Sequence, residues 1–424
     1  MIARLLLPLL LLLGLGGCAL KPERPRTLQS VDLFLDQAPP PLAQAALDRH
    51  YTDLLAHRYE PWRLDDLNAT PAQAAWPVAY YAGKAIYGEN LRPIPKRRFD
   101  AWVRNARYDA LDTLRRRAIT VRPTSLRLFP THRPIFYDPE KPGEGYPFDY
   151  NQNSAVKAMV PLYVSHLSMD GGWAFVRTPF ALGWVPIRDI AYLDDENRRR
   201  LTAMPLLVLL KDRAPLYDGD QAFVFYAQSA TLLPGLGRKG DLYETLLPDG
   251  GAFASAWLPA SWGASMPLPM TRDNIACVAA TLLGTPYTWG GLLQDRDCSA
   301  TVRDFFMPFG IWLPRNSAAQ AKVGRVIDLQ GLAPKAKERR IIAEGVPFRT
   351  LLHMPGHILL YVGHRDGHAY ALQNLWGIRT RSGGRILIGE TVVTDLWLGA
   401  DLPDADPESL PIRRIDSMNI VTER

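Results

Sequence analysis

The stretch "PYTWGGLLQDRDCSATVRDFF" (residues 286–306) places a cysteine directly after a residue type that often caps helices. Asp297 can accept backbone N–H groups with its carboxylate, so the sequence predicts a helix that begins at Cys298. Unpaired N–H groups at a helix start favour an anion, and the thiolate is the reactive form of cysteine. Cys298 is therefore a candidate nucleophile, although a small apolar residue can also start a helix. Four apolar residues follow at helical spacing: Val302, Phe305, Phe306 and Phe309.

A cysteine nucleophile needs a base that accepts its proton, and histidine is the usual one. Among the eight histidines, His357 begins the apolar stretch "HILLYVG" and directly follows Pro355 and Gly356. This pattern predicts a buried strand that holds the imidazole at the edge of a sheet. A helix that faces later strands is typical of an α+β domain. The residues 289–291, Trp-Gly-Gly, permit a tight turn and a close approach of another chain segment.

The composition excludes several classes of protein. With 47% hydrophobic and 22% charged residues, the chain is that of a folded globular protein. Its 424 residues exceed one ordinary core, and such a length predicts about three structural units. The net charge of +6 is modest and no long Lys/Arg run occurs, so we expect no nucleic-acid partner. The sequence has no metal-binding pattern of His-Glu-x-x-His or Cys-x-x-Cys type, so we expect no metal or other cofactor.

The first 18 residues read "MIARLLLPLLLLLGLGGC", with one positive charge, an apolar run and small residues before a cysteine. This pattern predicts a secretory signal peptide over residues 1–17. The ending resembles the bacterial lipobox, which implies lipidation of Cys18; an ordinary signal peptide with a chance cysteine is the alternative. We therefore expect a lipid anchor in a membrane of the cell envelope, on its periplasmic face. The third cysteine, Cys277, lies in an apolar helical pattern and is expected in the core, with a disulfide to Cys298 as the alternative.

Three segments precede the region around Cys298, which we assign to residues 269–424. Residues 18–120 are expected to form a linker and a mostly helical stabilising domain, with helical patterns at 41–59 and 108–119. Residues 121–196 contain short β-rich runs separated by turns, which is typical of a small barrel. Residues 197–268 look like a more divergent copy.

Two motifs in the first barrel resemble a bacterial SH3 domain. They are the turn Asp170-Gly-Gly-Trp173 and the strand Gly183-Trp-Val185. Trp184 is expected to pack in the barrel core. In the second barrel, the corresponding turn is expected at Asp249-Gly-Gly251.

The sequence around Cys298 and His357 resembles the NlpC/P60 family of papain-like cysteine peptidases. The resemblance covers residues 270–400 approximately and depends on several motifs in a fixed order. This family orients its histidine with a polar residue on the next strand, most often a second histidine. Here Gln373 takes that place and can accept the imidazole N–H, with Asn374 as the alternative. Besides Cys298 and His357, the matching positions are Tyr287, Trp289, Gly290, Gly291, Asp297, Ser299, Leu313, Pro314, Arg315 and Ser317.

The resemblance implies a multidomain α+β fold, in which a papain-like domain follows two SH3-like barrels and a mostly helical segment. It also implies hydrolysis of the γ-D-glutamyl-diamino acid bond in stem peptides of peptidoglycan. In relatives with two SH3 domains, the first barrel helps to recognise the free amino end of the peptide. The stretch "GEGYPFDYNQNS" offers Glu144, Asp149 and Tyr150 for this role. Further candidates for substrate binding surround the nucleophile: Tyr287, Trp289, Asp297, Ser299, Arg315 and Ser317.

Two other functions remain open from the sequence. A peptidoglycan amidase could use the same cysteine mechanism on another stem bond, such as the muramoyl-L-alanine bond. A non-catalytic lipoprotein could use the same fold to bind the cell wall. In each case we expect a monomer whose partners are stem peptides and, through Cys18, a membrane.

Overall fold

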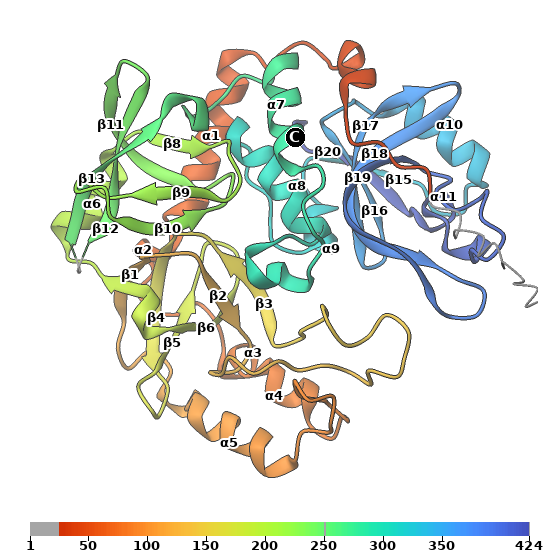
Figure 1. Cartoon of the computed structure of the whole chain (residues 1–424). Helices are drawn as coiled ribbons and strands as arrows, with labels where there is room; N and C mark the ends of the chain where they lie inside the picture. Colours follow the sequence, from red (N-terminus) through yellow and green to blue (C-terminus); the bar gives the residue numbers. More distant parts are fainter. Residues whose placement is uncertain (1–24, 250–251, 424) are drawn as a thin grey trace, which may run out of the picture.

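The computed structural model describes residues 25–249 and 252–423, so Cys18 and the expected signal peptide lie outside the described residues. Within these ranges, no helix is both long and apolar enough to cross a membrane. Helices α7 and α8 lie between the second barrel and the large sheet of the C-terminal domain, and the first barrel lies below them (Figure 1).

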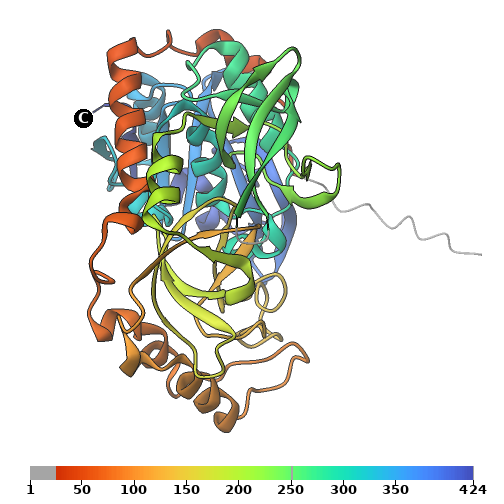
Figure 2. The ribbon, with the colours of Figure 1, turned by 90° about the vertical axis from the view of Figure 1, so that its left-hand side faces the viewer.

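The N-terminal segment is mostly helical, and its longest helix, α1, runs along one side of the molecule (Figure 2). The segment 108–119, expected to be helical, forms a short turn and then strand β1. Asp112 and Arg115 have φ angles of 57° and 46°, which a right-handed helix cannot contain. In the strand that follows, Ala118 and Ile119 are buried. The elements are η1 (Asp32–Gln37), α1 (Gln44–Arg58), α2 (Glu60–Arg63), α3 (Pro71–Ala74), α4 (Trp76–Tyr81), α5 (Lys96–Ala106) and η2 (Tyr108–Ala110).

The first barrel is an antiparallel sheet with the strand order β3-β2-β6-β5-β4-β1-β7. It begins at Arg116, within the segment that we assigned to the N-terminal domain. Trp184 is fully buried, in agreement with its expected place in the core. Between β2 and β3, residues 128–151 form a long loop that extends toward the C-terminal domain (Figure 1). The elements are β1 (Arg116–Thr120), β2 (Thr124–Arg127), β3 (Gln152–Val156), β4 (Pro161–Leu167), β5 (Trp173–Arg177), β6 (Leu182–Pro186), η3 (Ile187–Asp189) and β7 (Ile190–Tyr192).

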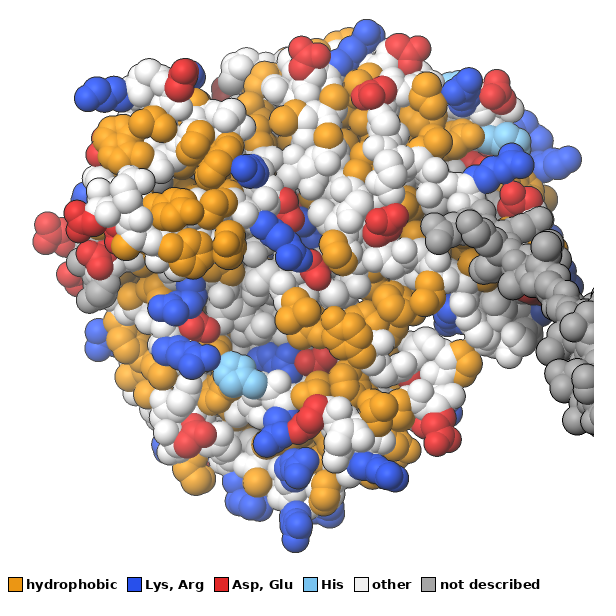
Figure 3. All heavy atoms as spheres, viewed as in Figure 1, with side chains coloured by type: hydrophobic (Ala, Val, Ile, Leu, Met, Phe, Trp, Pro, Cys, Tyr) orange, Lys and Arg blue, Asp and Glu red, His pale blue; other side chains and the backbone are white. Residues whose placement is uncertain are grey.

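The second barrel combines a five-stranded sheet, β13-β12-β11-β8-β14, with the β9-β10 hairpin. Asp249 ends β12 at the expected turn, whose two glycines lie outside the described residues. Hydrophobic side chains gather on the outside of this barrel (Figure 3), among them Phe223, Tyr226 and Trp257. The elements are α6 (Asp195–Ala203), β8 (Leu206–Leu209), β9 (Ala214–Tyr217), β10 (Phe223–Ala227), β11 (Leu232–Lys239), β12 (Leu242–Asp249), β13 (Ala252–Pro259), η4 (Ala260–Trp262) and β14 (Gly263–Ser265).

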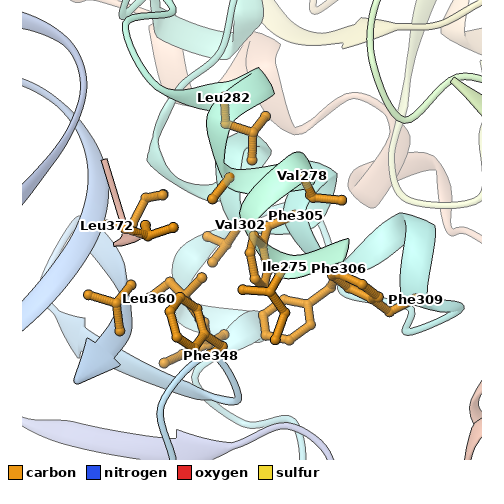
Figure 4. Packing of buried hydrophobic residues seen from close by; sticks show 14 of the residues in the cluster. Ile275, Val278, Leu282, Val302, Phe305, Phe306, Phe309, Phe348, Leu360 and Leu372 are labelled. Atoms are coloured by element: carbon orange, nitrogen blue, oxygen red, sulfur yellow. The ribbon is translucent and has the colours of Figure 1, made fainter. Parts of the chain in front are cut away.

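The C-terminal domain packs α7 and α8 against a six-stranded antiparallel sheet with the order β15-β20-β16-β17-β18-β19. The phenylalanines of α8 and η6 are buried between these layers, as their helical spacing predicted (Figure 4). The elements are α7 (Arg272–Leu282), η5 (Trp289–Gln294), α8 (Cys298–Phe306), η6 (Met307–Phe309), α9 (Ser317–Gln320), β15 (Arg325–Asp328), α10 (Pro334–Glu344), β16 (Thr350–Met354), β17 (His357–Arg365), β18 (His368–Arg379), β19 (Arg385–Asp395), η7 (Pro407–Ser409), α11 (Pro411–Arg414) and β20 (Ser417–Ile420).

The expectation that Cys277 packs in the core is wrong. This cysteine is exposed and free, because it lies on the outer face of α7, while Ile275 and Val278 face the core. Cys298 is also free, so the alternative of a disulfide between the two is excluded.

Buried ion pairs connect α8 to both barrels. Asp304 on α8 accepts hydrogen bonds from Lys157 of the first barrel and from Arg296, each at 2.8 Å. Arg296 also donates to Asp212 of the second barrel, at 2.6 Å. We call these four residues the interdomain charge cluster. Because a buried charge without its partner is strongly unfavourable, the cluster ties the position of α8 to both barrels.

Candidate active site

Cys298 is the first residue of α8, as predicted, and Asp297 caps the helix by accepting the N–H of Ala300 at 2.8 Å. The cysteine is only 9% exposed. The backbone N–H groups of Ser299 and Ile358 interact with its sulfur and favour the thiolate. Since Ile358 is the second residue of β17, this contact places the thiol beside the start of that strand.

His357 is the first residue of β17, and its Nε2 donates to Oε1 of Gln373 at 2.9 Å. Gln373 in turn donates its amide N–H to Oγ1 of Thr394 at 2.7 Å, which fixes the orientation of the amide. With Nε2–H donated in this way, Nδ1 is the basic nitrogen of the imidazole. The predicted contact between Gln373 and His357 is therefore present.

Asn374, the alternative partner of His357, points to the other face of β18. Successive side chains alternate along a strand, so only one of these two neighbours can face the histidine. Asn374 donates to the backbone carbonyl of Arg296 at 3.2 Å and bonds no histidine. It supports the segment that leads into Asp297.

Burial favours the neutral forms of both the thiol and the imidazole in the resting site. Burial raises the pKa of Cys298 to about 12, and the nearby carboxylate of Asp297 adds to this effect. Burial also lowers the pKa of His357 to about 4, although its bond to Gln373 favours the charged form. The N–H groups at the helix start lower the pKa of the thiol, as expected, but burial raises it by more. The proton of Cys298 must move to His357 as the sulfur attacks.

Asp297, Ser299 and Arg315 form a buried network beneath the nucleophile. Arg315 Nη2 lies 2.6 Å from Oδ2 of Asp297, and its Nη1 donates to Oγ of Ser299 at 2.8 Å. Its Nε donates to Ser154 of the first barrel at 2.7 Å. Burial alone would raise the pKa of Asp297, but Arg315 and the surrounding hydrogen bonds hold this pKa below its usual value. These three predicted binding residues therefore fix the start of α8 and connect it to the first barrel.

Ser317 is the first residue of α9, and Asn316 caps that helix. In the same helix, Gln320 donates to the carbonyls of Ser299 and Pro314, each at 2.9 Å. The contacts of α9 with the site therefore come from Gln320, a residue that the sequence did not indicate.

A cleft of about 1490 Å³, including its open mouth, lies over His357 and Gln373. The long loop of the first barrel contributes Glu144, Phe148 and Tyr150 to its lining. Three aromatic side chains from the C-terminal domain face this loop. Phe148 lies 5.5 Å from Trp376 and 6.0 Å from Tyr287, and Tyr150 lies 5.0 Å from Trp289, between ring centroids.

Glu144 and Tyr150 face the cleft together, whereas Asp149 does not. The hydroxyl of Tyr150 donates to Oε2 of Glu144 at 2.9 Å. Asp149 is 2% exposed and forms an ion pair with Arg127 at 2.7 Å, while it also accepts the N–H of Ile135. The expectation that Asp149 binds substrate is therefore wrong, because its carboxylate is used to hold the base of the loop.

The Trp-Gly-Gly motif forms the contact between the catalytic domain and β3 of the first barrel. Gly290 and Gly291 have φ angles of 63° and 70°. A Cβ atom on Gly290 would lie 2.4 Å from the carbonyl oxygen of Gln152, and one on Gly291 would lie 2.9 Å from Ala155. The predicted close approach is present, and β3 is the neighbouring segment.

Phe148 and Trp376 line the cleft but were not identified from the sequence. Phe148 directly precedes the predicted residue Asp149, and Trp376 lies three residues after Gln373. An aromatic residue close in sequence to a candidate polar residue could therefore have indicated both. Within residues 25–249 and 252–423, no three His, Cys, Asp or Glu side chains lie close enough together to hold a metal ion.

Three family models match this chain. Residues 4–111 match the N-terminal stabilising domain of NlpC/P60 proteins, residues 134–186 match an SH3 domain of the SH3b1 type, and residues 284–367 match the NlpC/P60 family. A solved NlpC/P60 endopeptidase from Photobacterium damselae has the same fold, with a TM-score of 0.84 and 21% identity. The match covers 95% of this chain and 98% of that one.

Two curated relatives are similar to this chain over shorter regions. A γ-D-glutamyl-L-lysine dipeptidyl-peptidase from Bacillus cereus is 28% identical over 159 residues, which are 35% of this chain and 46% of the relative. The peptidoglycan endopeptidase RipB from Mycobacterium tuberculosis is 31% identical over 173 residues, which are 35% of this chain and 65% of the relative. The chain thus spans about half the length of the first of these relatives and under two thirds of the second. By these matches, residues 284–367 are an NlpC/P60 cysteine peptidase domain, and an NlpC/P60 stabilising domain and an SH3 domain of the SH3b1 type precede it in the chain.

Proposed function

We propose that this protein hydrolyses the γ-D-glutamyl-diamino acid bond of peptidoglycan stem peptides that have a free N-terminal L-alanine. The observation that supports this function most directly is the cleft, whose lining contains both the His357–Gln373 pair and the Glu144–Tyr150 pair. The printed name of the Bacillus cereus relative describes the same type of bond.

In the proposed mechanism, Nδ1 of His357 takes the thiol proton while Sγ of Cys298 attacks the amide carbonyl carbon. Gln373 accepts the N–H of the resulting imidazolium and keeps the ring in place. The first N–H groups of α8 have no carbonyl partner within the helix, so the backbone N–H of Cys298 is a suitable donor to the oxyanion. The imidazolium then protonates the leaving amine, and the C–N bond breaks. Water, activated by His357, hydrolyses the thioester and restores the thiol.

The pair of Glu144 and Tyr150 in the cleft lining supports a preference for peptides with a free amine. An ammonium group needs a carboxylate and further acceptors in a restricted space, and Glu144 with the Tyr150 oxygen provides them. The aromatic rings of Phe148 and Trp289, with centroids 6.3 Å apart, lie beside Tyr150 and make this part of the cleft less polar, which strengthens an ion pair. An acetyl group on L-alanine would remove the positive charge and add bulk at this position.

The first experiment compares the parent protein with Cys298→Ala and with Cys277→Ala, which changes an exposed cysteine of α7. Mass analysis of the products of L-Ala-γ-D-Glu-diamino acid peptides should show a freed L-Ala-D-Glu dipeptide with the parent and with Cys277→Ala only. An intact stem released from a muramoyl peptide would support the amidase instead. If the parent and Cys298→Ala both leave every peptide intact but bind it, a cell-wall binding protein becomes the better explanation.

A second experiment tests recognition of the amino end. The parent should cleave a free tripeptide much faster than its N-acetylated form, and Glu144→Gln should reduce that preference by about tenfold, the size of one charge-assisted hydrogen bond. Equal rates on both peptides with the parent protein would contradict this recognition.

We also propose that lipid on Cys18 anchors the protein as a monomer to a membrane of the cell envelope. The signal-like sequence of residues 1–18 supports the anchor. Mass spectrometry of the N-terminal peptide and fractionation of Cys18→Ala cells test the anchor. Release of the parent protein into the soluble fraction would contradict it.

A further inference from the structure

Three arginines line the wall of the cleft: Arg379, Arg385 and Arg414. Arg379 lies 3.7 Å from the carboxylate of Asp406, which offsets its charge. Within the described ranges, neither Arg385 nor Arg414 forms an ion pair. Two cationic side chains in this wall are therefore available to a negatively charged ligand.

The other acidic groups of the cleft have partners of their own. Glu408 lies 3.4 Å from Arg413, which is outside the cleft lining. Glu144 accepts the hydroxyl of Tyr150, in the position that we propose for the substrate amine. Arg385 interacts electrostatically with Glu144, which offsets part of its charge, whereas the described carboxylates of the cleft lining form no ion pair with Arg414.

Arg414 lies beside the catalytic histidine. Its Nη2 donates to the carbonyl of Pro355 at 2.8 Å, two residues before His357. Its charge also contributes, after burial, to the lowered pKa of His357. The leaving amine must take its proton from His357, so a side chain beside this histidine lies beside the leaving group. The guanidinium of Arg385 completes this wall and packs against Gly143 of the loop.

We propose that Arg414, together with Arg385, binds a carboxylate on the side chain of the diamino acid that leaves. The inference rests on the proposed function and specifies its substrate class: a diamino acid with a second carboxylate, such as meso-diaminopimelic acid, is preferred over lysine. A guanidinium binds a carboxylate through two parallel hydrogen bonds. Both diamino acids have an ammonium group at the end of the side chain, but only meso-diaminopimelic acid has a carboxylate beside it that balances this charge. Attraction to the first ligand and repulsion of the second both contribute to the preference.

The test measures kcat/KM for L-Ala-γ-D-Glu-meso-diaminopimelic acid and for L-Ala-γ-D-Glu-L-Lys. We expect the parent to prefer the first peptide by at least about tenfold and Arg414→Gln to reduce this ratio by about tenfold, with a smaller reduction in Arg385→Gln. Arg365→Gln is the matched control, because it removes the same charge from the far end of β17, where Arg365 pairs with the exposed Asp366. The control should keep the ratio of the parent.

Three results would overturn the assignment. One is a parent protein that cleaves both peptides equally well, and another is an Arg414→Gln variant that loses the same factor on both. The third is a variant that instead loses discrimination between D-glutamate and D-isoglutamine, which would place the bound carboxylate on the acyl side. If the parent cleaves neither peptide, the proposed function fails, and binding of the two peptides to Cys298→Ala protein still tests the arginine site by itself.

Discussion

Replacing Gln373 by leucine removes the acceptor that orients His357 and keeps a side chain of similar volume. The amide oxygen lies 2.9 Å from the imidazole nitrogen, and Thr394 holds the amide from the other side. Gln373 is only 1% exposed, so water has little access to the lost position. We expect kcat to fall with little change in KM, because the change affects the imidazole and not the binding of the peptide.

The size of the loss follows from the burial of the imidazole N–H. A buried donor without an acceptor costs about 1–3 kcal/mol. If this cost appears in the transition state, where the imidazolium needs the acceptor most, the rate falls roughly 5- to 150-fold. The hydrogen bond to Gln373 favours the charged ring, so its loss lowers the pKa of His357 further below about 4. The acid limb of the pH profile should therefore move to lower pH.

The assay measures kcat and KM on the free tripeptide across a pH series, with thermal unfolding as a check on the fold. Gln373→His keeps a ring nitrogen that can accept the bond and should recover part of the lost rate. Asn374→Leu is the matched control, because it removes a buried amide from the opposite face of β18. If Gln373→Leu has the kcat of the parent while Asn374→Leu does not, the orienting role of Gln373 is refuted.

Three further predictions follow from the burial and packing of the site. Because the pKa of Cys298 is raised to about 12, alkylation of its thiol by iodoacetamide should accelerate about tenfold per pH unit from pH 7 to 9; mass spectrometry of its peptide measures this, and a flat rate would indicate a preformed thiolate. Gly290→Ala should strain the contact with Gln152 and lower the melting temperature in calorimetry, whereas unchanged melting would contradict the close packing. Asp304→Ala should reduce the free energy of unfolding by about 3–5 kcal/mol in urea titrations, since it removes the carboxylate from the buried Arg296 and from the partly buried Lys157; a loss below about 1 kcal/mol would be inconsistent with the interdomain charge cluster.

The parts of the fold that depend on local chemistry were predictable. The cap at Asp297 and the apolar spacing after it correctly placed the start of α8, and the glycine pair correctly predicted a close neighbour. Gln373 could be named only with Asn374 as an alternative, because the face of a strand depends on its register in the sheet. That register becomes visible only once β17, β18 and β19 are paired.

The predictions for Asp149, Cys277 and residues 108–119 were wrong because distant residues or small differences in angle decide the structure at these positions. Asp149, in the loop after β2, is bound by Arg127, the last residue of that strand, and no local sequence pattern predicts this pair. Cys277 is exposed because one step along a helix turns a side chain by about 100° away from the core. The end of the expected helix at 108–119 depends on backbone angles at Asp112 and Arg115, which have no glycine signal.

The interdomain charge cluster has a consequence for the evolution of this architecture. Family models treat the SH3 domain and the catalytic domain as separate units, and recombination could in principle exchange one without the other. Here a replacement for the first barrel that has no counterpart of Lys157 would remove one cation from Asp304. A replacement for the second barrel that has no counterpart of Asp212 would remove a carboxylate from Arg296. The two barrels and helix α8 should therefore be inherited together. A chain with a replacement barrel should fold stably only when that barrel brings compensating charges.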